Sequence, residues 1–177
     1  MDFIPATSGM LQLSPMNQAE FERYCEDLIA SYADENVKAG VWDAVSALSN
    51  ARKSFQDILP SGLRTPDNFL YNIIGSTAGE NVGNVWINIL HNSDASTAYI
   101  FDLQISPAFR NRGYGREALL AIERLAMDQG IGSIGLHVFA HNEIAQRLYR
   151  AAGYEVSGYR MQKRLLARNH LAASPIA

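Results

Sequence analysis

The chain has 177 residues, of which 47% are apolar and 19% are charged. This length and balance are typical of one globular domain, which we place at residues 1–177, and they exclude disordered and fibrous classes. Fifteen Lys and Arg residues against 18 Asp and Glu residues give a net charge of −3, so the chain lacks the basic excess typical of a nucleic-acid-binding protein.

Cysteine usage and hydropathy indicate the cellular setting. Cys25 is the only cysteine, which excludes an internal disulfide and a cysteine-rich metal site. The apolar runs are far shorter than the roughly 20 residues that cross a bilayer. The N-terminus carries Asp2 where a signal peptide carries positive charge. We therefore expect a cytoplasmic protein with neither a membrane nor a nucleic acid as its partner.

The first third of the sequence predicts one strand and two helices. The strand is expected at residues 10–13, and Ser14 and Pro15 are expected to supply the N-cap and first turn of the next helix. Apolar side chains then recur at helical spacing until Gly40. A second helix is predicted before Pro60, from a stripe that comprises Trp42, Val45, Leu48, Phe55 and Leu59.

Three strands rich in aromatic and β-branched residues are predicted next, at residues 69–74, 82–90 and 98–105. In the third strand, alternation places Asp102 on the face opposite to Tyr99 and Phe101. A helix that ends near Gly130, a strand at 133–139, a helix at 142–152 and two short strands near 154–156 and 159–165 complete the prediction.

The fold class that this order predicts is α/β (α+β), with a mixed, mostly antiparallel central sheet flanked by helices. The strand at 98–105 is expected to run parallel to the strand at 133–139, because a helix connects them and such crossovers join parallel strands. The turn between the first of these strands and the helix then lies at the carboxyl end of that strand.

That turn carries the clearest chemical signal. It contains Arg110, Arg112, Gly113, Gly115 and Arg116, and it opens a helix whose first backbone N–H groups are unpaired and suited to a phosphate. Both glycines are expected to let a ligand approach closely. The dinucleotide and Walker fingerprints are absent, which excludes a Rossmann domain and a P-loop NTPase.

Two motifs at this point resemble those of the GNAT superfamily of N-acetyltransferases. The family pattern [Q/R]-x-x-G-x-[G/A] is matched by Arg110, Asn111, Arg112, Gly113, Tyr114 and Gly115. A second pattern, an Asn that begins a helix, a Tyr seven residues later and then Gly-aromatic, is matched by Asn142, Tyr149, Gly153 and Tyr154. The order of predicted elements also matches from Met10 to Leu165.

The resemblance implies an acetyl-CoA-dependent enzyme that acetylates a primary amine by direct attack, with no metal. It implies that the turn up to Arg116 holds the pyrophosphate, that Asn142 hydrogen-bonds the cofactor, and that backbone groups of Leu103 and Ile105 pair with the pantetheine arm. It further implies a V-shaped splay between the fourth and fifth predicted strands, and a bulge that aims an N–H at the thioester oxygen.

For catalysis, the resemblance places Tyr149 near the CoA sulfur as the general acid. The family's strand carboxylate has no counterpart at Tyr99 or Phe101. Asp102 is a candidate base through water, or merely the partner of an arginine; His137 is a further candidate, although a strand histidine is more often a core residue. His91 and His141 have the character of loop or strand-end residues, and an amine that binds neutral needs no base.

The acceptor is expected to be a small-molecule or peptide amine, bound between the helical hairpin and the first strands. Five aromatic side chains are candidates for its wall, although most such residues are core: Tyr24, Tyr32, Trp42, Tyr71 and Trp86. The alternative reading is a catalytically silent acyl-CoA-binding or regulatory module of the same fold. A protein-modifying enzyme in a larger assembly ranks third, and a homodimer is compatible with the sequence.

Overall fold

The computed structural model describes residues 7–8, 11–76, 78–92, 95–161 and 163. The helices of this part are α1 (Gln18–Lys38), α2 (Ala47–Ile58), α3 (Tyr114–Asp128) and α4 (Glu143–Ala151), with short 3₁₀ turns at Gly62–Arg64 and Pro107–Phe109. The strands are β1 (Thr7–Ser8), β2 (Leu11–Pro15), β3 (Asn68–Gly75), β4 (Asn81–Leu90), β5 (Thr97–Ile105) and β6 (Ser133–Leu136).

The six described strands form one sheet in the order β1-β2-β3-β4-β5-β6. Each neighbouring pair is antiparallel except β5 and β6, which are parallel. Helix α3 makes the connection between these two, which takes the chain back to the end of the sheet at which β5 began. The predicted mixed sheet and its one parallel pair are therefore confirmed.

Strands β5 and β6 separate halfway along β5. Their register joins Thr97 to Ser133 and continues only to Ile100 and Leu136, whereas β5 itself runs on to Ile105. Residues 137–139, which the sequence assigned to the strand, leave the sheet. The predicted splay is confirmed, and in the described part of the chain it leaves the second half of β5 with a neighbouring strand on one side only.

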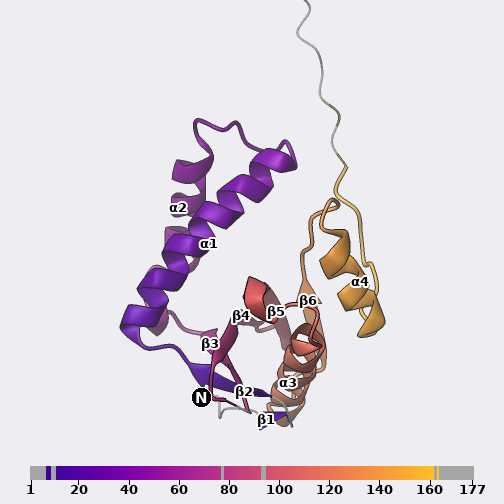
Figure 1. Ribbon diagram of the computed structural model, residues 1–177. Coiled ribbons are helices and arrows are strands. Elements are labelled where there is room, and N and C mark those ends of the chain that lie inside the picture. Colours follow the sequence, from indigo (N-terminus) through magenta and orange to yellow (C-terminus); the bar gives the residue numbers. More distant parts are fainter. Residues whose placement is uncertain (1–6, 9–10, 77, 93–94, 162, 164–177) are drawn as a thin grey trace, which may run out of the picture.

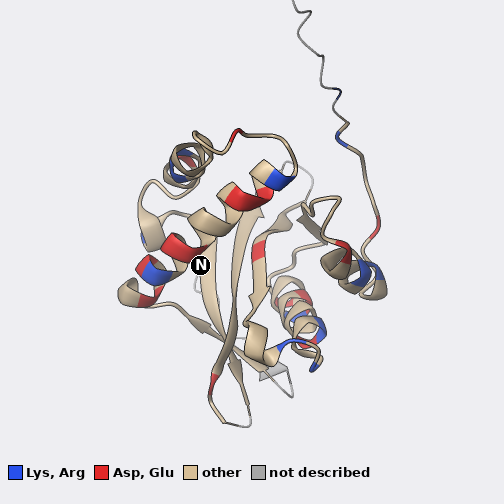
Figure 2. Cartoon of the chain, turned by 45° about the horizontal axis from the view of Figure 1, so that its top comes forward, with Lys and Arg blue, Asp and Glu red and all other residues tan. Residues whose placement is uncertain are grey.

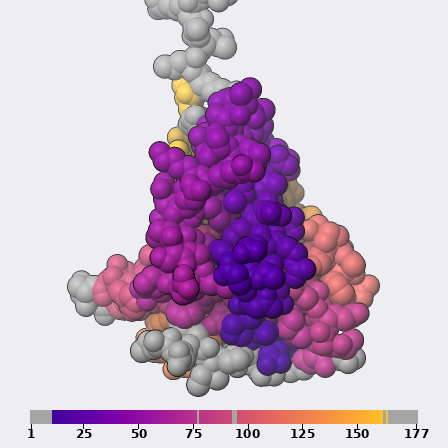
Figure 3. All heavy atoms as spheres, turned by 90° about the vertical axis from the view of Figure 1, so that its left-hand side faces the viewer, coloured from indigo at the N-terminus to yellow at the C-terminus, as the bar shows by residue number. Residues whose placement is uncertain are grey.

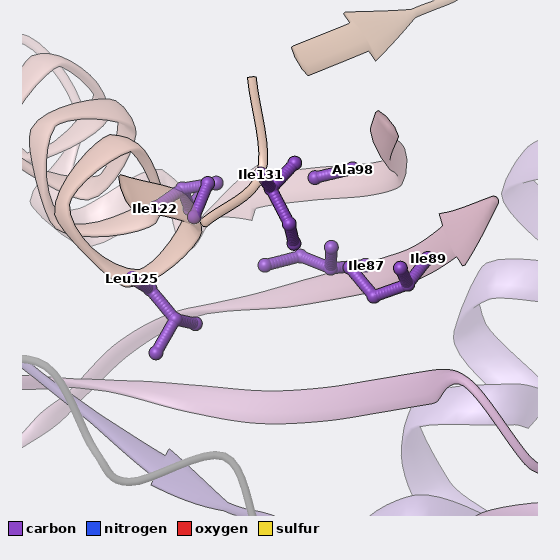
Figure 4. A pocket seen from close by; sticks show the side chains of 7 residues that line it. Ile87, Ile89, Ala98, Ile122, Leu125 and Ile131 are labelled. Atoms are coloured by element: carbon purple, nitrogen blue, oxygen red, sulfur yellow. The ribbon is translucent and has the colours of Figure 1, made fainter. Parts of the chain in front are cut away.

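The helices cover both faces of the sheet (Figure 1). Helices α1 and α2 pack on one face over a cluster that contains Met16, Tyr24, Phe55, Leu59, Leu70 and Trp86, and their atoms form the middle of that side of the molecule (Figure 3). Helix α3 packs on the other face, where the labelled side chains of Figure 4 are all hydrocarbon. The pocket in Figure 4 is therefore lined by packing side chains that carry no reactive group.

The start of α1 differs from the expectation. Ser14 and Pro15 belong to β2, and the N-cap is Asn17, whose side chain accepts a hydrogen bond from the Glu20 N–H while Glu20 accepts one from the Asn17 N–H. This reciprocal capping box satisfies two N–H groups that a lone Ser14 cap would not. Pro15 is accepted as the last residue of its strand, where little pairing remains.

The start of α2 is also later than expected. Asp43 accepts hydrogen bonds from the N–H groups of Val45 and Ser46, and this turn delays the helix to Ala47. Val45, expected on the buried stripe, is 96% exposed. The buried stripe of α2 instead comprises Ala47, Ala51 and Phe55.

The expected strand at residues 154–156 is wrong, because the structure assigns no strand there. Residues 159–161 also lack strand structure, and most of the rest of the expected strand at 159–165 lies outside the described residues. The side chains of Val156, Tyr159 and Met161 are exposed. High β-propensity alone forms no ladder, and within the described part of the chain no neighbouring strand accepts hydrogen bonds from residues 154–156.

Candidate active site

The Arg- and Gly-rich turn lies where the sequence placed it, between β5 and α3. Asn111 and Gly113 have positive φ values of 60° and 85°, and Gly113 is the N-cap of α3. A Cβ on Gly113 would meet nothing within 4 Å, so open space lies beside the first turn of the helix. The unpaired N–H groups of that turn and the positive end of the helix dipole suit an anion.

The side chains of this turn surround the same point. Arg110, Arg112 and Arg116 are exposed, and the turn is the basic segment beside the sheet in Figure 2. The Nε of Arg110 donates a hydrogen bond to the Ile105 carbonyl over 3.0 Å, and the Arg112 guanidinium lies 5.7 Å from the centre of the Phe109 ring. Arg110 therefore ties the turn to the end of β5, while Arg112 and Arg116 supply the accessible charge.

Gly115 has another role than the one expected from sequence. A Cβ at this position would lie 3.0 Å from Cδ2 of Leu148 in α4. The missing side chain thus permits close packing between α3 and α4. The close ligand approach expected of both glycines fits the open space at Gly113 and does not fit Gly115.

A β-bulge in β5 changes the predicted facing of its side chains. Trp86 of β4 pairs with Asp102 and Ile87 pairs with Ile100, which leaves Phe101 as the extra residue. A bulge inverts the alternation beyond it, so Asp102 lies on the face of Trp86, under α1 and α2. The expectation that Asp102 faces away from Tyr99 and Phe101 is wrong, because simple alternation assumes an uninterrupted ladder.

Asp102 sits among aromatic side chains on this face. The Tyr24 hydroxyl donates a hydrogen bond to Oδ2 of Asp102 over 2.9 Å, and the Phe101 and Trp86 rings stack with centres 4.6 Å apart. Burial raises the pKa of Asp102 to about 6, although hydrogen bonds from Tyr24 and from the Leu103 N–H lower it. Asp102 is therefore mostly ionised at neutral pH and able to accept a proton near it.

The backbone of the second half of β5 presents its groups to the open side. The Ser106 N–H donates to the Val82 carbonyl of β4 over 2.9 Å, and N–H and C=O groups of successive strand residues point to opposite edges. Those of Leu103 and Ile105 therefore point away from β4, toward the splay. The Ile105 carbonyl already accepts the bond from Arg110, whereas Leu103 lies free of that contact.

Tyr149 lies in α4, and Asn142 directly precedes this helix. Asn142 is the N-cap and accepts a hydrogen bond from the Ala145 N–H over 3.2 Å, so its expected structural role is confirmed. Tyr149 is half-buried, with its ring centre 5.7 Å from that of Tyr154. Burial, and then the charge of Asp102, raise the pKa of Tyr149 to about 12. Tyr149 therefore keeps its proton at neutral pH and lies within reach of the field of Asp102.

The histidines take different places. His137 lies one residue beyond β6 and is exposed, with its ring 5.0 Å from that of Phe139, so it is no core residue. His91 hydrogen-bonds Ser96 and Asp67, as expected of a loop residue. His141, in the loop before α4, contacts the Glu35 carboxylate of α1, a link that the sequence reading missed.

The five candidate wall aromatics separate into groups. Tyr24 and Trp86 are buried in the cluster beneath α1 and α2, and Tyr32 packs edge-on to Trp42 at 5.4 Å. Tyr71 belongs to the core on the α3 side of the sheet, so its placement in an acceptor wall is wrong. Phe101, which sequence reasoning missed for this purpose, is 39% exposed beside Trp86.

No group of three His, Cys, Asp or Glu side chains in the described part of the chain could hold a metal ion. None of its helices is both long and apolar enough to span a membrane.

Known proteins resemble this chain in both sequence and fold. Residues 26–154 match the model of the Acetyltransferase (GNAT) family. The chain is 35% identical to YycN of Bacillus subtilis, which is named an uncharacterized N-acetyltransferase. The alignment spans 155 residues, which are 88% of this chain and 99% of the relative. The crystal structure of YycN superposes with a TM-score of 0.84 over 89% of this chain and 99% of that one.

Two further relatives are more distant. YdgE of Bacillus subtilis, also named an uncharacterized N-acetyltransferase, is 29% identical over 153 residues, which are 86% of this chain and 97% of the relative. The aminoglycoside N-acetyltransferase AAC(6')-Iy in complex with CoA is 15% identical, with a TM-score of 0.55 over 91% of this chain and 98% of that one, and shares the fold. The chain belongs to the GNAT family of acetyltransferases.

Proposed function

We propose that this chain is an N-acetyltransferase that transfers an acetyl group from acetyl-CoA to a primary amine of a small molecule or peptide by direct attack. The observation that carries the proposal is the bulge in β5. It turns Asp102 toward α1, on the half of β5 that extends beyond its pairing with β6. Tyr149 of α4 is close enough for the charge of Asp102 to raise its pKa, which supports a pairing of base and acid beside the open strand edge.

The residues of the turn and strand fit the CoA chain. The N–H groups at Gly113 to Arg116, with Arg112 and Arg116, suit the pyrophosphate because they combine helix-terminal donors with exposed positive charge. The open edge at Leu103 and Ile105 suits the amide-bearing pantetheine arm, which can pair as an added strand does. Asn142 lies at the start of α4 and is proposed to contact the same arm. Acetyl-CoA, when bound, supplies the acetyl group as a thioester.

The proposed general base is Asp102. An amine is protonated at neutral pH and must lose a proton before its lone pair can attack. With a pKa of about 6, Asp102 is ionised above that pH and accepts this proton, directly or through one water. The bulge also takes the backbone at Phe101 out of the β4 ladder. We assign a backbone N–H at this bulge as the hydrogen-bond donor to the oxyanion.

The proposed general acid is Tyr149. Because its pKa is raised to about 12, its hydroxyl carries a proton at neutral pH and donates it, or a hydrogen bond, to the departing thiolate. The balanced reaction converts an ammonium and a thioester into an amide, a thiol and one proton released to solvent. Asp102 passes the proton that it accepts to solvent, and Tyr149 regains the proton that it donates to the thiolate. Each side chain therefore ends in its starting protonation state.

The alternative of a silent acyl-CoA-binding module drew its support from the missing strand carboxylate. The bulge speaks for the enzyme instead, because it places Asp102 on the same face of the sheet as Tyr99. The two alternatives make different predictions for the Asp102→Asn variant. An enzyme loses turnover with Asn at this position, whereas a binding module keeps its CoA affinity and has no turnover to lose.

The deciding experiment is an acceptor screen that follows release of free CoA from acetyl-CoA. Polyamines, aminoglycosides, amino acids and short peptides are the acceptor classes to test, with Asp102→Asn as the matched negative control. We expect at least one class to give turnover that depends on Asp102. Tight CoA binding with no turnover in any class, at pH 7 to 9, would favour the binding module instead.

A further inference from the structure

The Tyr24 hydroxyl links α1 to the bulged strand. Tyr24 is only 6% exposed, and its hydroxyl donates to Oδ2 of Asp102, 78 positions later in the chain, over 2.9 Å. The ring packs in the cluster with Met16, Phe55 and Trp86. A phenylalanine would fill the same space, so packing alone does not explain the hydroxyl.

Besides Tyr24, the Leu103 N–H donates a hydrogen bond to the Asp102 side chain. Asp102 stands directly after the bulge residue Phe101, on the half of β5 that β6 has left. No lysine or arginine within the described residues forms an ion pair with it, since the ion pairs found there involve other carboxylates. A hydrogen bond from a neutral donor to a carboxylate is charge-assisted and directional, so Tyr24 sets where this carboxylate points.

The groups around the pair keep Tyr24 a donor. Burial, and next the charge of Asp102, raise the pKa of Tyr24 well above its ordinary value. Burial, and then the charge of Asp102, raise the pKa of Tyr149 of α4, so Tyr149 is also protonated at neutral pH. Cys25, beside Tyr24 on α1, has a pKa raised by burial to about 11 and is neutral too. A carboxylate has about four acceptor sites, so the bonds from Tyr24 and Leu103 leave room for the proton of an amine.

We propose that Tyr24 is a positioning residue for acetyl transfer, whose hydroxyl holds the Asp102 carboxylate toward the splay and favours its charged form. This inference rests on the proposed function, in which Asp102 is the base. Tyr24 transfers no proton in the reaction. It acts through Asp102, and it couples the placement of α1 to the reactivity of β5.

The first test is the pH dependence of kcat/KM in Tyr24→Phe. Loss of the hydrogen bond removes an interaction that favours the carboxylate, so the acid limb of the profile is expected to move up by about one pH unit. The activity deficit is then about fivefold near pH 6, approaches about tenfold below pH 5 and disappears near pH 9. A deficit by the same factor at every pH, or none at all, would overturn the role of Tyr24.

A second measurement needs no acceptor. Carbon-detected NMR can follow the Asp102 carboxyl through its titration in the wild type and in Tyr24→Phe. The carboxyl is expected to titrate at higher pH in the variant. An unchanged titration midpoint contradicts the proposal, whatever the acceptor is.

The matched control is Tyr71→Phe. Tyr71 is equally buried, at 2% exposure, but lies in the core on the α3 side of the sheet. Its variant loses a phenol hydroxyl without approaching Asp102, so neither the pH profile nor the titration of Asp102 is expected to change. A shift of similar size in this control would mean that loss of a buried hydroxyl acts through general stability.

The Tyr24→Phe/Asp102→Asn double variant separates this inference from the proposed function. If Tyr24 acts through Asp102, the double variant is no slower than Asp102→Asn alone. Wild-type turnover in Asp102→Asn would defeat the proposed base itself. A large loss in Asp102→Asn together with an additive loss from Tyr24→Phe would defeat only the role of Tyr24.

Discussion

Leu148 of α4 packs over Gly115 in the first turn of α3, where a Cβ on the glycine would lie 3.0 Å from Cδ2 of Leu148. The next residue of α4 is Tyr149. This contact therefore couples the helix that begins at the proposed anion-binding turn to the helix that carries the proposed acid.

Gly115→Ala is expected to lower kcat more than CoA affinity. The new methyl group displaces Leu148 and with it the neighbouring Tyr149, while the gain in helix propensity, about 1 kcal/mol, offsets the steric cost in stability. We expect a severalfold loss of kcat and a change in unfolding free energy within about 1 kcal/mol. Gly132→Ala is the control, because a Cβ there meets nothing within 4 Å. Equal kcat values in the two variants would mean that α4 does not move.

Gly113→Val is expected to abolish CoA binding. Gly113 has φ +85° and faces open space, so a β-branched residue there strains the backbone, at roughly 1 to 3 kcal/mol, and occupies the proposed phosphate site. Arg112→Ala should weaken binding less. Calorimetric titration with CoA measures both effects.

The control for this change is Gly130→Val at the far end of α3. Gly130 has φ +69° and also faces open space, so the variant carries similar strain far from the turn. Its stability is expected to fall while its CoA affinity does not. Unchanged CoA affinity in a folded Gly113→Val protein would refute the pyrophosphate site.

Tyr149→Phe is expected to keep folding and CoA affinity while turnover falls. The variant removes only the hydroxyl, which holds its proton at neutral pH because burial raises its pKa to about 12. Positioned acid catalysis contributes about 10²-fold to 10⁴-fold, and the low end is expected because a thiol with a pKa near ~8.5 is a good leaving group. The measurement is kcat under conditions where chemistry is rate-limiting. A kcat within about twofold of wild type would make Tyr149 a packing residue.

Asp102 is expected to make stability depend on pH. Its pKa is about 6 in the folded chain against an ordinary value of 3.8, so the fold favours the neutral form. The contribution of neutral Asp102 to the free energy of unfolding is complete below pH 3.8 and is lost as the pH rises through about 6. Relative to wild type, Asp102→Asn should therefore gain up to about 3 kcal/mol between pH 4 and pH 7. Urea unfolding at several pH values tests this, and a constant difference between the two proteins would contradict it.

Acceptors with a carboxylate beside the amine are expected to react poorly. The Asp102 carboxylate contacts Tyr24 of α1 and raises the pKa of Tyr149 of α4, and α1 itself carries six acidic and two basic residues. Like charges at close range near a protein surface repel by several kcal/mol at most. We expect phenethylamine to exceed phenylalanine by at least about tenfold in kcat/KM, with phenylalanine amide close to the amine. A preference for the amino acid would place a cation in the acceptor site.

By itself, the sequence determined the parts of this protein that local chemistry controls. The turn at Arg110 to Gly115 could be predicted because its glycines, arginines and helix N-terminus are neighbours in the chain. The parallel pair of strands followed from the helix between them, since such connections have few geometries. The N-cap at Asn142 is likewise a local hydrogen bond.

Tertiary structure alone decided how the proposed base is presented. Phe101 is an extra residue only relative to the register of β4, so the face of Asp102 cannot be read from alternation in β5. The Tyr24 hydroxyl comes from 78 residues away, and the contact of Leu148 with Gly115 joins two helices. Such contacts depend on how whole elements pack. Residues 154–156 show the reverse case, in which residues of high β-propensity have no neighbouring strand among the residues that the structure describes. Local patterns thus locate the proposed anion-binding end of the site, and packing between distant elements assembles its proposed reactive end.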